Sequence, residues 1–243
     1  MLFVPNCYIH PYLRAVLYGI AAATAALLFT AVLAAALRLP ARRAGILDRR
    51  RQRPLPLLGG LAVVVVTCLV AGTGEWTRVA PLGDGVGRLL VAAAAVAGLG
   101  LVADVWRLRA RVLVTGTAVA AVCVVPYDET GVPGGLLAIG WIVLATLAFK
   151  GLDHADGLAG TVGVVTAFGA GACAAAEVMD GLAVLLSVVA AALTGFLMHN
   201  WHPARVGLGA CGSLFTGFVL SSAVVFTRAG YDIGPSAAVV FCL

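Results

Sequence analysis

Long apolar runs, separated by short polar breaks, make up most of the chain. The runs are about 16 to 22 residues long, and a helix needs about 20 apolar residues to cross the hydrocarbon core of a bilayer. The pattern therefore predicts an all-α fold, a polytopic transmembrane helical bundle that forms a single integral membrane domain over residues 1–243. We predict eight spans, at about 16–37, 57–73, 86–102, 112–126, 134–149, 158–176, 181–198 and 211–227.

The two ends of the pattern need separate interpretation. The first run is too long for the core of a signal peptide and only Arg14 precedes it, so we predict a retained helix. Residues 234–243 begin another apolar run and stop, which predicts a partial ninth span and an end that is cut short.

The composition excludes a water-soluble protein. The 243 residues are 62% hydrophobic and 11% charged, with a mean hydropathy of +1.05, whereas soluble domains carry roughly a quarter charged residues. The six cysteines are scattered without a CxxC spacing, which argues against a disulfide framework or a zinc site. Aromatic residues are few among the arginines, and nothing in the sequence indicates nucleic-acid binding.

The basic residues predict the orientation in the membrane. Cytoplasmic loops carry an excess of Lys and Arg, and eight spans place 12 of the 16 basic residues on one side. We therefore predict a multi-pass protein of the cell membrane whose N-terminus lies outside. The predicted cytoplasmic loops are about 38–56, 103–111, 150–157 and 199–210.

The cluster from Arg49 to Arg53 has two interpretations. Its arginines fix the topology and contact anionic headgroups, or they attract phosphate-bearing substrates to the membrane surface. The sequence leaves both open.

Polar side chains in three of these loops suggest a site. In KGLDHADGLAG, the spacing of Asp153 and Asp156 places both carboxylates on one helical face, although Asp156 also suits a helix N-cap. Asp104 ends the third span, and His202 and Arg205 precede the eighth. Carboxylates suit Mg²⁺, while arginines and exposed N–H groups suit phosphate. Together they favour phosphoryl transfer at the membrane surface.

Motifs of this chain resemble, in order, those of the polyprenyl-phosphate N-acetylhexosamine-1-phosphate transferase family. The similar stretches are GILD and PLPLLGG in the first loop, GLGLVAD at 98–104, FKGLDHADGLAG at 149–160 and NWHPARVGLGACGSLFTGF at 200–218. The resemblance implies that a polyprenyl phosphate attacks the β-phosphorus of a UDP-linked amino sugar and releases UMP, with Mg²⁺ stabilising the charge. It implies a role in assembly of cell-envelope glycan.

The resemblance also assigns roles to residues. It implies catalytic and metal-binding roles for Asp104, Asp153 and Asp156. The positions that it implies for substrate binding are Lys150, Asn200, Arg205, Gly209, Gly212 and Ser213.

Several positions depart from the family pattern. Ala103 and Ala210 replace family aspartates, and an alanine has no oxygen to bind a metal or accept a proton. Lys150 replaces an asparagine and adds a positive charge, which disfavours Mg²⁺. His202 and Cys211 are alternative metal ligands, but a small residue beside a glycine turn explains Cys211 more simply.

Three functions stay open. One is a transferase that works with the reduced set of Asp104, Asp153 and Asp156. Another is a catalytically inactive homologue that binds lipid phosphate or a nucleotide sugar, with Lys150 contacting a phosphate, or that acts as a scaffold. The third is a transporter or channel, which would need ionisable groups deeper in the spans. A homodimer is a further open possibility, together with the lipid bilayer, polyprenyl phosphate and the UDP-amino sugar as partners.

Overall fold

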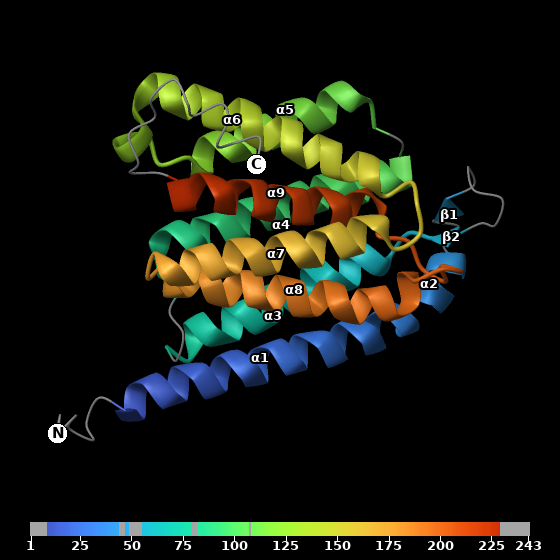
Figure 1. Ribbon diagram of the computed structural model, residues 1–243. Helices are drawn as coiled ribbons and strands as arrows, with labels where there is room; N and C mark the ends of the chain where they lie inside the picture. The colour runs from blue at the N-terminus through green and yellow to red at the C-terminus, as the bar shows by residue number, and fades with distance from the viewer. Residues whose placement is uncertain (1–8, 44–46, 49–54, 79–81, 107, 229–243) are drawn as a thin grey trace.

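The computed structural model describes residues 9–43, 47–48, 55–78, 82–106 and 108–228. Its long helices lie side by side in one bundle, with the short elements at one end (Figure 1). The elements of this part are α1 (Ile9–Ala36), α2 (Arg38–Arg43), β1 (Leu47–Asp48), β2 (Leu55–Pro56), α3 (Gly59–Trp76), α4 (Gly83–Trp106), α5 (Ala110–Val124), α6 (Tyr127–Leu152), α7 (Leu158–Ala176), α8 (Asp180–Asn200) and α9 (Gly209–Arg228).

The predicted fold class is confirmed. In the described part of the chain, seven helices are long and apolar enough to cross a membrane: α1, α3, α4, α6, α7, α8 and α9. Their apolar surfaces face lipid without penalty, which explains why large side chains such as Leu28 and Phe29 stay exposed. The protein is a multi-pass membrane protein.

The predicted span at 112–126 corresponds to α5, which has 15 residues. At 1.5 Å per residue it is about 22 Å long, less than the roughly 30 Å of a hydrocarbon core. Asp104 near the end of α4 and Asp153 after α6 both bond to the N-terminus of α9, so α4 and α6 finish at the same end. Helix α5 must therefore lead back to the other end, and it supplies the eighth crossing in spite of its length.

Two helices begin earlier than predicted, and the first polar loop contains regular structure. Helix α1 begins at Ile9, about two turns before the predicted span. Helix α6 begins at Tyr127 because a first turn precedes the kink at Gly131, where φ is +66°, and Pro133 follows. The first polar loop contains α2 and a two-stranded antiparallel pair, with Leu47 opposite Pro56. The Arg49–Arg53 cluster and residues 234–243 lie outside the described residues.

Helix α9 forms the centre of the bundle. In its apolar window, 89% of the residues are buried, and Phe215 and Phe218 are fully enclosed. Helices α3, α4, α6 and α7 all contact α9. These helices therefore determine where the N-terminus of α9 lies.

Exposed tryptophans mark both ends of the bundle. Trp76 ends α3 and is 90% exposed, while Trp106 and Trp201 are 75% and 66% exposed at the end where Asp104 lies. Tryptophan prefers the boundary between lipid and water. These residues therefore locate the two membrane surfaces on the fold.

Candidate functional site

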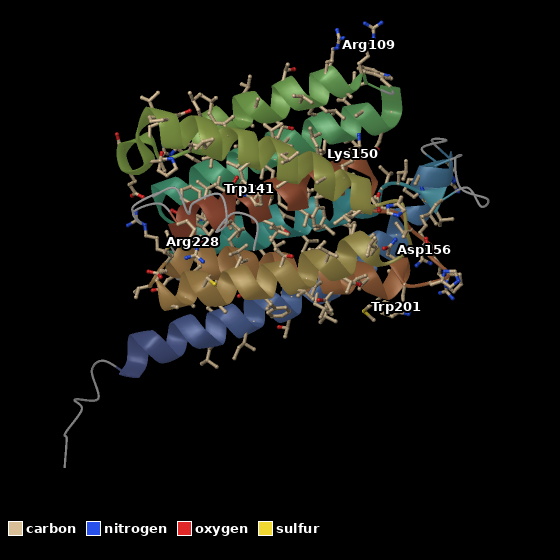
Figure 2. All side chains as sticks on the ribbon, turned by 45° about the horizontal axis from the view of Figure 1, so that its top comes forward. Arg109, Trp141, Lys150, Asp156, Trp201 and Arg228 are labelled. Carbon is tan, nitrogen blue, oxygen red and sulfur yellow. The ribbon has the colours of Figure 1, made fainter. Side chains whose placement is uncertain are left out.

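Four segments that are far apart in the sequence meet at one end of the bundle. The N–H of Gly207 donates to the carbonyl oxygen of Pro56 at 2.8 Å, and the N–H of Gly59 donates to Gly207 at 3.2 Å. Asp104, Asp153 and Asp156 reach the same 204–211 segment. Figure 2 shows Lys150 and Asp156 toward this end and Arg228 toward the opposite end. We call this end, with its segments 55–60, 104, 150–157 and 200–211, the motif end.

Asp104 binds the N-terminus of α9. One carboxylate oxygen accepts the N–H of Ala210 at 2.9 Å, and the other accepts the N–H of Cys211 at 3.1 Å. The first N–H groups of a helix have no partner inside the helix and carry its partial positive charge. Asp104 satisfies two of them and thereby ties α4 to α9.

Asp153 binds the neighbouring position. Its Oδ2 accepts the N–H of Gly209 at 2.9 Å. Gly209 has φ of +69°, and a side chain there would bring a Cβ to 2.6 Å from the carbonyl oxygen of Leu57. Three consecutive N–H groups, at 209, 210 and 211, therefore point to two carboxylates, and only glycine fits the first of these positions.

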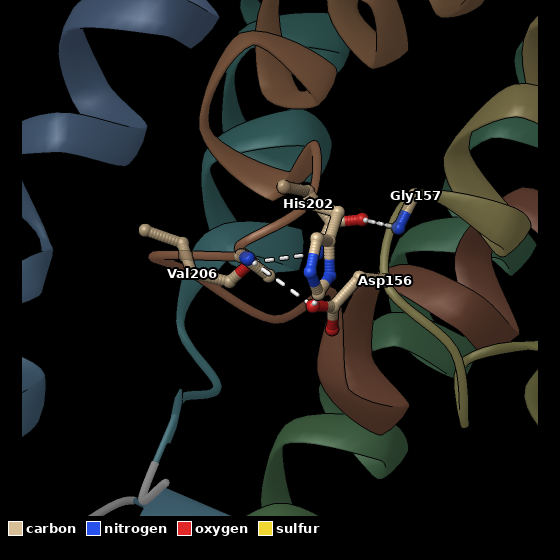
Figure 3. Close-up of polar contacts among 6 residues, drawn as sticks. Asp156, Gly157, His202 and Val206 are labelled. Carbon is tan, nitrogen blue, oxygen red and sulfur yellow. Dashed lines mark hydrogen bonds and ion pairs between the residues drawn. The ribbon is translucent and has the colours of Figure 1, made fainter.

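Asp156 holds the loop before α9. Its Oδ2 accepts the N–H of Ala204 at 3.2 Å and lies 3.2 Å from Nδ1 of His202 (Figure 3). His202 is 81% exposed and Asp156 is 23% exposed. Gly157, not Asp156, is the N-cap residue of α7, so the predicted N-cap is displaced by one position.

Asn200 lies inside the structure between the two loops. It is 3% exposed, its Oδ1 accepts the N–H of Gly157 at 3.0 Å, and its Nδ2 donates to the carbonyl of Val206 at 2.7 Å. Figure 3 shows Gly157 and Val206 on either side of this contact. Both polar ends of the amide are engaged by backbone, so Asn200 holds the 150–157 loop against the 201–206 loop.

The remaining predicted residues are divided between surface and interior. Lys150 lies half-buried in the last turn of α6, and Arg205 is exposed. Gly212 and Ser213 are buried, and the Ser213 hydroxyl donates to the carbonyl of Gly209 within the same helix. Lys150 and Arg205 thus lie at the surface of the motif end, whereas Gly212 and Ser213 are buried within the packing of α9.

The close approach of α3 and α9 requires glycine on both helices. A Cβ on Gly60 would overlap the backbone of Gly212 and the carbonyl oxygen of Leu208, and a Cβ on Gly212 would overlap Gly60. Small residues allow such backbone contact between membrane helices. This contact fixes the depth of the α9 N-terminus relative to the 55–59 segment.

Carboxylates are the ligands that Mg²⁺ prefers, but their arrangement here does not fit a site shared by all three aspartates. Both oxygens of Asp104 and one oxygen each of Asp153 and Asp156 accept backbone N–H groups. No group of three or more His, Cys, Asp or Glu side chains in the described ranges is placed to hold a metal ion. Ala103 and Ala210 add no oxygen. We therefore derive no chemical step through Mg²⁺.

The structure contains two contacts that the sequence did not predict. The contact between Asp156 and His202 joins residues 46 positions apart, and no spacing rule predicts such a pair. His199 in the last turn of α8 places Nε2 at 3.0 Å from the carbonyl oxygen of Ala31 in α1. A histidine at the end of an apolar run was the only signal for this contact, and it does not specify the partner.

Comparison with known proteins gives a family match. The model of the family described as glycosyl transferase family 4 matches residues 86–228. The match covers α4 to α9 and thus all three aspartates and the α9 N-terminus.

Individual relatives extend this likeness toward the N-terminus. A putative glycosyltransferase of Streptomyces coelicolor is 68% identical over 220 residues, which are 89% of this chain and 54% of the relative. A decaprenyl-phosphate N-acetylglucosaminephosphotransferase of Mycobacterium tuberculosis is 30% identical over 76% of this chain and 54% of its own length. A probable undecaprenyl-phosphate N-acetylglucosaminyl 1-phosphate transferase of Bacillus subtilis is 32% identical over 69% of this chain and 50% of its own. The chain spans about half the length of these curated relatives.

Proposed function

Because the chain belongs to glycosyl transferase family 4, we propose that it is a membrane sugar-1-phosphate transferase with impaired catalysis. Its substrates are a polyprenyl phosphate and a UDP-linked amino sugar, and its product is a precursor of cell-envelope glycan. The names of the mycobacterial and Bacillus relatives support the lipid and the amino sugar.

The observation that carries this proposal is the convergence at the motif end. Asp104 from α4 and Asp153 after α6 meet the first three N–H groups of α9. Lys150 and Arg205 supply positive charge at the same end. An electropositive surface beside carboxylates, at the boundary of lipid and water, suits a reaction between a lipid phosphate and a nucleotide pyrophosphate.

The residues of the chain act mainly by binding and orientation. In the transfer, an oxygen of the lipid phosphate attacks the β-phosphorus of the UDP-sugar, the bond to the bridging oxygen breaks, and UMP leaves with that oxygen. Lys150 and Arg205 balance the charge of the phosphates by direct contact. Asp104, Asp153 and Asp156 hold the loops that present these groups.

The missing carboxylates are the reason that we propose a reduced rate. Ala210 lies at the α9 N-terminus and Ala103 lies beside Asp104, so the site has two negative charges fewer than the family pattern. A cation that would neutralise the phosphates would consequently have fewer ligands here. A catalytically inactive homologue that only binds the substrates is the competing proposal, since all three aspartates already bond to backbone.

Turnover of the purified chain in detergent separates these proposals. UMP release is followed with UDP-N-acetylglucosamine, undecaprenyl phosphate and Mg²⁺, for the unmodified chain, Asp153→Asn, and the double variant Ala103→Asp with Ala210→Asp. Slow release that Asp153→Asn abolishes and the double variant accelerates supports the impaired transferase. The rise is expected to be about a hundredfold, since a single preorganised electrostatic group contributes about that factor.

Binding of the nucleotide sugar is measured in parallel, so that an assay without UMP release can be interpreted. Isothermal titration with UDP-N-acetylglucosamine reports on the ground state, and Lys150→Ala is expected to weaken binding about tenfold because it removes one charge-assisted contact. Binding without turnover in any variant supports the inactive homologue. Neither binding nor turnover contradicts both proposals.

A further inference from the structure

A deep apolar groove opens between α4 and α5, away from the motif end. Its volume is about 830 Å³. Its floor and walls are small or apolar over most of their length, and two charged residues lie at one end. The residues that line it are Glu75, Gly83, Gly87, Arg88, Val91, Ala92, Ala95, Val96, Leu99, Gly116, Val119, Ala120 and Cys123.

Glycines create the space in this groove. A Cβ built on Gly87 meets no atom within 4 Å, so the helix there faces open space. On α5, a Cβ on Gly116 would overlap the side chain of Leu99. Gly116 therefore lets α5 approach Leu99 of α4. Gly87 leaves open space in the part of the groove beside it.

The charged end of the groove lies at a membrane surface. Helix α4 begins at Gly83 and reaches the motif end at Asp104, so Arg88 lies near the opposite surface, which Trp76 marks. No hydrogen bond or ion pair joins Arg88 to another described residue. The Glu75 carboxylate accepts the N–H of Leu82 at 2.6 Å and is thus held by the backbone. Arg88 is the basic residue in the lining of the groove.

The groove is at least as long as one leaflet is deep. Arg88 and Leu99 are 11 residues apart on α4, which is about 16 Å at 1.5 Å per residue, and half of a hydrocarbon core is about 15 Å. The middle of α4 (Gly83–Trp106) lies near Ala95. A chain that starts beside Arg88 therefore passes the bilayer midplane before it reaches Leu99.

We propose that this groove binds a phospholipid of the leaflet opposite the motif end, with one acyl chain between α4 and α5 and the phosphate on Arg88. A guanidinium binds phosphate through directed, charge-assisted hydrogen bonds. The apolar walls accept the chain. The second large groove, between α1 and α3, has about 590 Å³ and no charged residue in its lining, so it lacks the group that would select a phosphate.

Photolabelling in vesicles tests the site directly. The full chain is reconstituted in phosphatidylcholine vesicles with a small fraction of phosphatidylglycerol that carries a diazirine on one acyl chain. After irradiation, labelled peptides are identified by mass spectrometry. The expected label lies on the groove walls, at Ala95, Leu99 and Val119.

Matched variants separate the groove from general lipid contact. Gly87→Leu fills the groove and is expected to abolish labelling there, whereas Gly98→Leu, which also faces open space on α4 but lies outside the groove, is expected to leave it unchanged. Arg88→Gln is expected to lower labelling about fivefold, the effect of one basic residue near an anionic membrane surface. Arg228→Gln, at the same end on α9, serves as its control. Thermal unfolding in detergent confirms that each variant is folded.

The outcomes decide between occupants. Equal labelling of all four variants and the unmodified chain overturns the proposal, because the label then reports only random lipid contact. Loss of label on addition of undecaprenyl phosphate assigns the groove to that lipid and also overturns it. Loss of label with increasing protein density in the vesicles indicates a second copy as the occupant. UMP release is independent of all these readings, so failure here leaves the proposed transferase untouched.

Discussion

Asp104 shows how one residue combines a site position with a structural bond. Its family position implies catalysis, yet its two oxygens hold the N–H groups of Ala210 and Cys211. In the described part of the chain, the carboxylates of Asp104 and Asp153 accept the N–H groups of this helix terminus. Removing either charge therefore affects the position of the site as well as its chemistry.

Asp104→Asn is expected to lower the free energy of unfolding by about 1–2 kcal/mol, because it removes a charged helix cap in a partly buried position. Unfolding in detergent, followed by circular dichroism against temperature, measures the change. Asp128→Asn, at an exposed position in the first turn of α6, is expected to change it by less than about 0.5 kcal/mol. Equal effects of the two variants would contradict the capping role.

Asn200→Ala is expected to loosen the two loops of the motif end. It removes a buried amide and leaves the N–H of Gly157 and the carbonyl of Val206 without that partner, at a cost of about 1–3 kcal/mol for each group. Hydrogen exchange at the Gly157 amide is expected to accelerate. Ser187→Ala, which removes an exposed hydroxyl from the same helix, is the control. Unchanged exchange at Gly157 in Asn200→Ala would rule out the positioning role.

Among the elements, the contact between α3 and α9 fixes the position of the α9 N-terminus relative to the 55–59 segment. Gly60 and Gly212 bring the two backbones together, and the segment before α3 then reaches Gly207 through its backbone. A bundle with larger residues at this crossing would hold the α9 N-terminus away from the 55–59 segment.

Gly60→Ala is expected to destabilise the bundle by about 3 kcal/mol or more, because the new methyl group overlaps backbone that has no free rotation to relieve it. Gly72→Ala provides the matched control on α3, since a Cβ there meets nothing within 4 Å, and it is expected to have no destabilising effect. Both are compared by the midpoint of thermal unfolding in the same detergent. A Gly60→Ala variant as stable as Gly72→Ala would show that the helices are farther apart than described.

For the whole molecule, the crossings place all four motif segments at one membrane surface. The hydrogen bonds between them require this arrangement. They do not specify which surface it is, and the excess of arginine predicts the cytoplasmic one.

Cysteine labelling in intact cells tests this orientation. In a background without the native cysteines, Thr77→Cys and His154→Cys introduce exposed thiols at opposite ends of the bundle. An impermeant maleimide is expected to label Thr77→Cys in intact spheroplasts and to label His154→Cys only after permeabilisation. Labelling of His154→Cys in intact spheroplasts would place the motif end outside.

The sequence alone determined the membrane class, the approximate spans and the segments that carry the site, because apolar length and motif order are local properties of the chain. Its resemblance to the family also predicts departures at Ala103 and Ala210. Only the tertiary structure showed that the buried Asn200 side chain bonds to Gly157 and that Asp156 contacts His202. The same holds for the bonds of Asp104 and Asp153 to the α9 N-terminus. The long-range contacts among these join residues 43 to 107 positions apart, and the packing of helices around α9 determines which of them meet.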